Sequence, residues 1–204
     1  MTNAAELRFV AEPRGYWLGD RPLRGITSTL VSAGIIDPSV YTGYESARDR
    51  GTRVHAAVQY DVEGDLDEAS VGVVIMGYVS AWRRFRDETG FVATEQPELL
   101  VCSPTLGYAT QVDLVGTIGG KVHVINLKTS RSPAPWWSVQ LAGEAIAYAE
   151  WAKQNAIYPW SLGRMSVQLA DDGAYKATTY RDRSDLDVFR AVALVSAWKE
   201  THHD

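Results

Sequence analysis

The chain has 204 residues and a formal net charge of −5, with 46% hydrophobic and 22% charged residues. This length allows one domain with a substantial core, and the composition is that of an ordinary globular protein. No apolar run approaches the roughly 18 residues of a membrane span. A single cysteine, Cys102, excludes an internal disulfide and a four-cysteine iron–sulfur site. We therefore expect one domain over residues 1–204 in a reducing, cytoplasmic setting, with no membrane contact.

The N-terminal half is predicted to contain a hairpin followed by helices. Residues 7–26 carry turn signals at Pro13-Arg14-Gly15, residues 28–32 begin a short helix, and residues 43–60 form a longer one. A stronger helix is predicted next, because apolar residues recur at intervals of three and four. It is expected to end at Thr89-Gly90, since glycine commonly ends helices. This stripe consists of Val71, Ile75, Tyr78, Trp82 and Phe85.

The C-terminal half is predicted to supply most of the sheet. We expect strands at 98–102, 164–169 and 175–180, a hairpin over 111–128, and helices over 138–154 and from Ser184 onward. This order of elements indicates an α/β or α+β domain with a central mixed β-sheet flanked by helices, preceded by an N-terminal hairpin and helices.

The hairpin over 111–128 is unusual because polar residues interrupt strands that are otherwise apolar. A two-residue turn at Gly119-Gly120 fixes the register, which places Asp113 directly opposite Asn126 with Cβ atoms about 4.5–5.5 Å apart. The period of two puts Lys128 on the same face as Asn126, opposite Gln111. Burying such groups is costly unless they are paired or bind a metal ion.

Two interpretations of these polar groups follow. In the structural one, Asp113 and Lys128 form a diagonal ion pair and nothing more. In the functional one, Asp113 and Asn126 hold Mg²⁺, which favours one or two carboxylates together with water and phosphate oxygens. Lys128 would then orient an attacking water and offset charge that develops on a phosphate.

Four short segments form a pattern through their order and spacing. They are RGTRVHAAVQ with His55, Glu98 in PELLVCSPTLGYAT, Asp113 with NLKTS at 126–130, and Gln140 in SVQLAGEAIAY. In this pattern the chain resembles the PD-(D/E)XK nuclease superfamily, most closely its RecB-like branch and the small nuclease-like proteins of bacteriophages and prophages. The resemblance implies a restriction-endonuclease-like core.

The resemblance also implies roles for individual residues. The metal ligands would be His55, Asp113, Asn126 and the main-chain carbonyl of Leu127, with Glu98 holding a second metal ion or supporting His55. Lys128 would be the catalytic lysine, together with Asp113 and Asn126, and Gln140 would touch the scissile strand or position Lys128. We expect DNA contacts from Arg48, Arg53, Arg131 and Tyr148.

The function implied is that of a hydrolase, a Mg²⁺- or Mn²⁺-dependent DNA nuclease without an iron–sulfur cluster. The resemblance further implies an exonuclease-like role in phage DNA recombination, replication or processing. The protein would act in the bacterial host cytoplasm, with other phage proteins as partners. Two other readings stay open. One is a catalytically inactive DNA-binding module of the same fold, and the other is a protein unrelated to nucleic acid.

Residue 126 departs from the pattern, which has Asp or Glu where this chain has asparagine. An amide oxygen can ligate a hard cation, but losing one charged interaction costs up to about 3 kcal/mol, roughly a hundredfold in affinity or rate. Either the chain is a natural variant, weakly active or limited to binding DNA, or it is an engineered inactive form.

Overall fold

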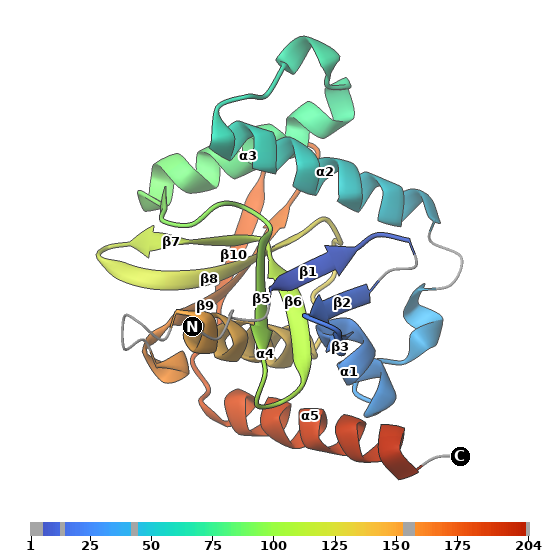
Figure 1. The fold of residues 1–204 in the computed structure, drawn as a ribbon. Coiled ribbons are helices and arrows are strands. Elements are labelled where there is room, and N and C mark those ends of the chain that lie inside the picture. The colour runs from blue at the N-terminus through green and yellow to red at the C-terminus, as the bar shows by residue number, and fades with distance from the viewer. Residues whose placement is uncertain (1–5, 13–14, 42–44, 153–157, 203–204) are drawn as a thin grey trace.

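The computed structural model describes residues 6–12, 15–41, 45–152 and 158–202 (Figure 1). Two five-stranded sheets form its framework, with strand orders β1-β2-β3-β6-β5 and β10-β9-β8-β7-β4. The strands are β1 Leu7–Val10, β2 Gly15–Leu18, β3 Arg21–Gly25, β4 Val92–Ala93, β5 Leu99–Ser103, β6 Tyr108–Val112, β7 Leu114–Ile118, β8 Lys121–Lys128, β9 Gly163–Leu169 and β10 Tyr175–Thr179. The α-helices are α1 Ile26–Ser32, α2 Glu45–Glu63, α3 Val73–Thr89, α4 Trp137–Trp151 and α5 Ser184–His202.

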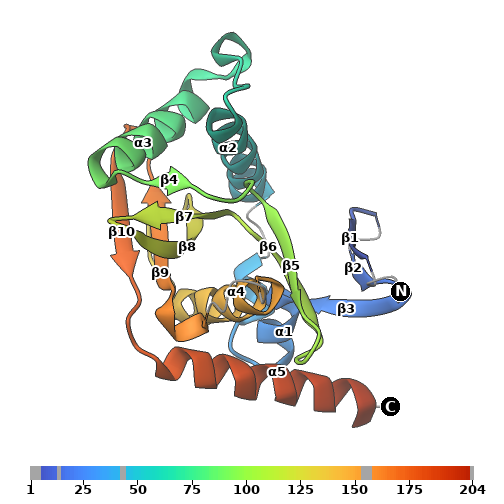
Figure 2. The ribbon, with the colours of Figure 1, turned by 60° about the vertical axis from the view of Figure 1, so that its left-hand side comes forward.

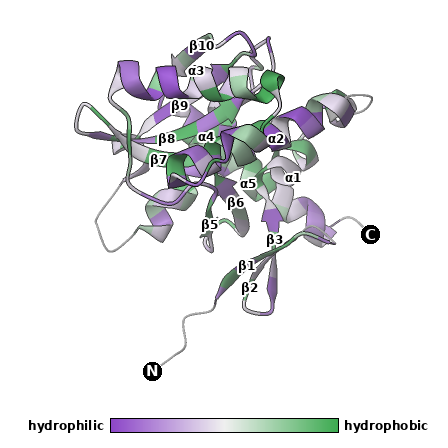
Figure 3. Cartoon of the chain, turned by 90° about the horizontal axis from the view of Figure 1, so that it is seen from above, coloured by the Kyte–Doolittle hydropathy of each residue, from purple (hydrophilic) through white to green (hydrophobic). Residues whose placement is uncertain are grey.

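The predicted fold class, a mixed sheet flanked by helices, is confirmed, although there are two sheets where one was expected. In the second sheet β8 and β9 are parallel while the other pairs are antiparallel. Helices α2 and α3 cover one face of this sheet, α4 lies against the other, and α5 packs beyond α4 (Figure 2). Strands β1 to β3 extend away from the rest of the molecule (Figure 3).

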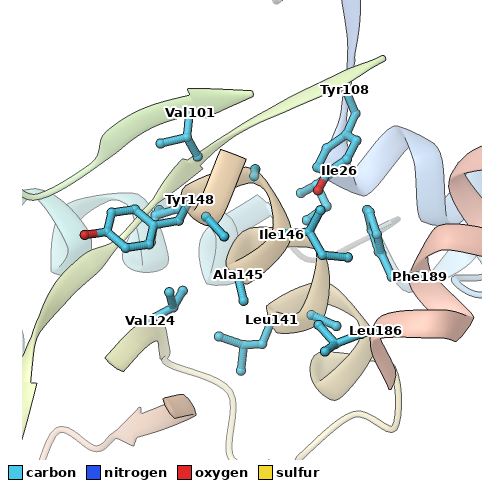
Figure 4. Close-up of a cluster of buried hydrophobic side chains, with 14 of the residues drawn as sticks. Ile26, Val101, Tyr108, Val124, Leu141, Ala145, Ile146, Tyr148, Leu186 and Phe189 are labelled. Atoms are coloured by element: carbon cyan, nitrogen blue, oxygen red, sulfur yellow. The ribbon is translucent and has the colours of Figure 1, made fainter. Parts of the chain in front are cut away.

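Helix α4 occupies the centre of the larger core. Every residue from 141 to 149 is buried, so the helix is surrounded by neighbours on all sides. Leu141, Ala145 and Ile146 pack with Phe189 of α5 and Tyr108 of β6 (Figure 4). The position of α4 between sheet and helix therefore places the acid Glu144 in a desolvated environment.

The predicted stripe of the helix that ends at Gly90 is confirmed in most of its members. Ile75, Tyr78, Trp82 and Phe85 are buried on α3 in the core shared with α2. Val71 lies before the first turn of this helix and is half-buried. Gly90 ends the helix with φ of 65°, the left-handed conformation that glycine adopts easily. No helix within the described ranges is both long and apolar enough to cross a membrane.

The predicted hairpin over 111–128 is correct at its turn and wrong at its base. The register runs from Ile118 opposite Lys121 to Leu114 opposite Ile125, as the two-glycine turn requires. Residue 113, however, belongs to no strand, and the preceding strand β6 pairs with β5 in the other sheet. The expected cross-strand partnership of Lys128 with Gln111 is therefore wrong. Gln111 pairs with Leu100, and Lys128 pairs with Gln168 of β9.

Glycine at position 77 is required by the contact between α3 and the turn that joins β9 to β10. A Cβ atom at this position would lie 1.8 Å from the carbonyl oxygen of Asp171. Gly77→Ala is expected to lower the free energy of unfolding by about 3 kcal/mol and Tm by roughly 6–12 °C, because two backbones must separate. The matched control is Gly72→Ala, whose Cβ meets nothing closer than 3.9 Å. Equal melting temperatures for the two variants, measured by circular dichroism, would contradict this expectation.

Candidate metal centre and active site

Three side chains from separate elements converge beside the second sheet. His55 comes from α2, Glu98 from the residue before β5, and Asp113 from the link between β6 and β7. Each offers one ligand atom, and these atoms all lie within 4.8 Å of one another. His55 Nδ1 is 3.4 Å from a carboxylate oxygen of Glu98 and 3.6 Å from one of Asp113. An imidazole with two carboxylates fits a divalent cation such as Mn²⁺, which accepts both nitrogen and oxygen ligands.

The backbone around Glu98 and Asp113 is held in an unusual arrangement. Among the described residues other than glycine, Glu98 alone has a positive φ, 53°, a conformation that costs about 1–3 kcal/mol. Its amide donates to the carbonyl oxygen of Asp113 at 3.0 Å. The carboxylate of Asp113 accepts from the amide of Leu127 at 2.6 Å. Strain of this kind persists where surrounding contacts fix the backbone, which here orients both carboxylates toward His55.

The ionisation of this group is strongly coupled. Burial raises the pKa of Asp113 to about 6, even though His55 and Lys128 lower it. Burial also works against a charged His55, but the carboxylates of Asp113 and Glu98 outweigh it and raise the pKa of His55 to about 9. Without a cation, a proton on His55 balances the carboxylates. Cation binding must therefore release that proton.

A second chain of polar contacts runs from β8 into α4. Lys128 Nζ donates to Gln140 Oε1 at 3.1 Å, and Gln140 Nε2 donates to Glu144 Oε1 at 2.9 Å. Asn126 Nδ2 donates to the same oxygen of Glu144 at 2.8 Å. Glu144 is fully buried, and burial together with Asp113 raises its pKa to about 8. The pattern-derived residues Asn126, Lys128 and Gln140 are thus brought together.

Lys128 also lies against two indole rings. Its Nζ is 5.4 Å from the ring centre of Trp136 and 5.3 Å from that of Trp137, within the range of cation–π contacts. Burial lowers the pKa of Lys128. The structural interpretation expected an ion pair between Asp113 and Lys128. Among the described residues no such pair forms, because Lys128 donates to Gln140 and Asp113 lies beside His55.

The candidate DNA-contacting residues are dispersed. Arg48 is exposed on α2 and lies two turns before His55, on the same side of the helix. Arg53 is turned about 200° from His55 around this helix and lines a cavity of about 370 Å³ with Tyr60. Arg131 is exposed after the end of β8. Arg53 therefore does not face the site, because helical geometry directs it elsewhere.

Tyr148 lies in the core of the structure. Its side chain is 3% exposed and packs beside Val101 and Val124 in the core (Figure 4). Its hydroxyl donates to Glu95 at 3.1 Å, and burial together with this carboxylate raises its pKa to about 12. In this position Tyr148 supports the packing of α4, and its contact with DNA stays a prediction.

Sequence reasoning missed Glu144, which contacts two of the candidate site residues. It is an acid within the apolar segment LAGEAIAYA of α4, four residues after Gln140 and therefore one helical turn away. That spacing, from an acid among residues 141–149 that are otherwise apolar, was an available signal.

Comparison with known proteins gives a limited result. No protein-family model matches the chain, and neither does any curated protein. Among solved structures, it is similar to the crystal structure of an alkaline exonuclease from Laribacter hongkongensis, with 18% identity, 85% of this chain and 89% of that chain covered, and a TM-score of 0.39. The complex of this exonuclease with dAMP gives 18% identity, 88% coverage of each chain and a TM-score of 0.35. At these scores the likeness carries no functional assignment, which depends on the side chains of the site.

Proposed function

We propose that the chain is a divalent-cation-dependent deoxyribonuclease that hydrolyses DNA phosphodiester bonds in an exonuclease-like manner. The observation that carries this proposal is the cluster of His55, Glu98 and Asp113, whose ligand atoms lie within 4.8 Å of one another. Lys128 stands one residue beyond Leu127, whose amide is bound by Asp113. A cation site can activate a water molecule, and a nearby ammonium group can offset charge that develops on a phosphate during hydrolysis.

The residues of this chain would divide the work as follows. His55, Glu98 and Asp113 would hold the cation, with Asn126 Oδ1 and the carbonyl oxygen of Leu127 as further ligands. The cation, when bound, supplies polarisation of the phosphoryl group and a lowered pKa for a water molecule. Lys128 would orient the attacking water and offset the charge developing on phosphate oxygens. Its lowered pKa favours proton exchange with that water.

Other residues of the chain would position Lys128 and the DNA. Gln140 and the two indole rings restrict the Nζ atom of Lys128 to one place. Arg48 and Arg131, both exposed, would contact backbone phosphates without reading sequence. The sequence resemblance supports a role in the recombination, replication or end processing of phage DNA.

Asn126 favours a second candidate, a module of this fold that binds DNA without cleaving it. Its Nδ2 is engaged by Glu144, and its uncharged oxygen is a weaker cation ligand than a carboxylate. This candidate predicts DNA binding in the presence of a chelator and no cleavage by any variant that restores the carboxylate.

Asp113→Asn is the direct test of the proposed site. The unaltered protein is expected to bind Mn²⁺, followed by electron paramagnetic resonance, and to cut linear, nicked or single-stranded DNA only when the cation is present. The variant should bind Mn²⁺ roughly a hundredfold more weakly and lose cleavage, because a buried anionic ligand is neutralised. Asp172→Asn, an exposed acid in the turn after β9, is the control and should change neither.

Crystals soaked in Mn²⁺ provide the structural counterpart. An anomalous peak is expected between His55, Glu98 and Asp113. The proposal fails if no peak forms there and no tested DNA is cut.

A further inference from the structure

We propose that Glu144 is a positioning residue of this site, whose Oε1 atom fixes the orientation of two amide side chains, Asn126 and Gln140, that face the reaction. This inference rests on the proposed function and deepens it. Glu144 makes no hydrogen bond to the proposed cation ligands His55, Glu98 and Asp113. It acts through its hydrogen bonds to Asn126 and Gln140.

The geometry of a planar amide makes this control possible. The nitrogen and oxygen of an amide lie on opposite sides of its carbonyl carbon, so a bond to one determines where the other points. Because Asn126 Nδ2 donates to Glu144 at 2.8 Å, Asn126 Oδ1 is directed away from Glu144. That oxygen is the one atom of the side chain able to ligate a hard cation.

The same carboxylate oxygen determines the orientation of the side-chain amide of Gln140. Gln140 Nε2 donates to Glu144 Oε1 at 2.9 Å, which leaves Gln140 Oε1 to accept from Lys128 Nζ at 3.1 Å. If Gln140 were reversed, its NH₂ group would face the ammonium of Lys128 and would repel it. One oxygen of Glu144 therefore orients both amides. It directs the oxygen of Asn126 away from Glu144, and it directs the oxygen of Gln140 toward Lys128.

Packing alone does not account for an acid at this position. Glu144 is fully buried between Leu141 and Ala145, and its second oxygen, Oε2, has no hydrogen-bond partner in the described part of the chain. Burying a carboxyl group costs free energy, either as desolvation of its charge or as the protonation that avoids a buried charge, and an unsatisfied oxygen adds to that cost. A leucine would fill the same space without this cost. The contacts with Asn126 and Gln140 explain an acid at this position.

Positions 126 and 144 are chemically matched in this chain, since the amide donates and the acid accepts. Replacing Asn126 alone by aspartate would set two carboxylates at the 2.8 Å separation now bridged by that donor, and they would have to share a proton. Exchanging both groups, with aspartate at 126 and glutamine at 144, keeps one donor and one acceptor. The carboxylate is then restored on β8 next to Asp113.

The experiment compares Glu144→Leu, Asn126→Asp and the double variant with aspartate at 126 and glutamine at 144 with the unaltered protein. Glu144→Leu removes the acceptor oxygen, whereas glutamine would keep one. It is expected to weaken Mn²⁺ binding by about 10–100-fold and to lower kcat on linear duplex DNA by a similar factor, with KM for DNA unchanged. The double variant should bind Mn²⁺ more tightly than either single variant. Glu150→Leu is the matched control on α4, because Glu150 also has one unpartnered oxygen but bonds to Ser103, and it should change neither quantity.

A second measurement separates this inference from the proposed function. The side-chain NH₂ groups of Asn126 and Gln140 should give slowly exchanging NMR signals without any cation, assigned by their loss in Asn126→Ala and Gln140→Ala. In Glu144→Leu, which removes the acceptor, both signals should shift and exchange faster. Should that variant not fold, Glu144→Asp, which withdraws the carboxylate by one methylene, should show the same change.

The outcomes are distinct. The inference is overturned if both NH₂ signals and Mn²⁺ binding are unchanged in Glu144→Leu, or if Asn126→Asp alone matches the double variant. Absence of Mn²⁺ binding and DNA cleavage in the unaltered protein would refute the proposed function, while the NH₂ signals would still decide whether Glu144 orients the two amides.

Discussion

Replacing Lys128 with methionine is expected to lower kcat for DNA cleavage by about 100- to 10,000-fold while Mn²⁺ binding stays within about twofold. Methionine fills a similar volume between Trp136 and Trp137, so packing is largely preserved. It carries no proton and no charge, so it can neither orient the attacking water nor offset charge on the phosphate. The measurement is single-turnover cleavage of linear duplex DNA with saturating Mn²⁺.

Lys121→Met is the control for this experiment. Lys121 begins the same strand, β8, and is exposed at the end remote from the site, so the change of charge is identical. Its kcat should equal that of the unaltered protein. Equal cleavage by both variants would remove Lys128 from the reaction.

The second large effect concerns pH. Without a cation, the free energy of unfolding is expected to decrease as pH rises from about 5 to about 9. The pKa values of Asp113, Glu144 and His55 are raised in the folded protein to about 6, about 8 and about 9. At these three groups the folded state therefore binds more protons than the unfolded state, and each added increment of pH favours unfolding. The lowered pKa values of His123 and Lys128 act in the opposite direction.

Each group contributes in its own window. The protonated form of Asp113 contributes to the free energy of unfolding, and this contribution is lost as pH rises to about 6. The contribution of protonated Glu144 is lost as pH rises to about 8. The contribution of a charged His55 is complete below its unfolded pKa of 6.5 and is lost as pH passes about 9. The total is on the order of a few kcal/mol, so Tm should fall by roughly 5–10 °C.

Thermal unfolding in the presence of a chelator, at intervals from pH 5 to pH 9, measures this dependence. Saturating Mn²⁺ should raise Tm most at high pH, because the cation replaces the proton of His55. Glu144→Gln should flatten the curve between pH 5 and pH 8. A chelated protein whose Tm rises over this range would show that these acids are not held as the geometry indicates.

Local chemistry made much of this fold predictable. The turn at Gly119-Gly120 fixed the register of β7 and β8 because two glycines with positive φ determine a hairpin without outside help. The buried stripe of α3 followed from helical periodicity. The departure of β6 into another sheet did not follow, because it depends on pairing with β5, which no property of residues 108–112 encodes.

The site was predictable in its members and less so in its connections. His55, Glu98 and Asp113 come together as expected, yet Asp113 contacts the backbone of Leu127 and not the side chain of Asn126. The departure of Arg53 from the site could have been foreseen from helical phase alone. The sequence marks Glu144 only by its spacing of four residues from Gln140, and its contact with Asn126 becomes apparent only from the structure.

The location of Asp113 between two sheets has a mechanical consequence. Its carbonyl is tied to Glu98, which leads into β5 of one sheet, and its carboxylate is tied to Leu127 in β8 of the other. A small displacement of one sheet relative to the other must change the spacing of the ligand atoms. Val112, Val115 and Val124, buried in the core beside α4, help set that displacement. The affinity of the proposed cation site would thus depend on buried residues that do not contact the ion.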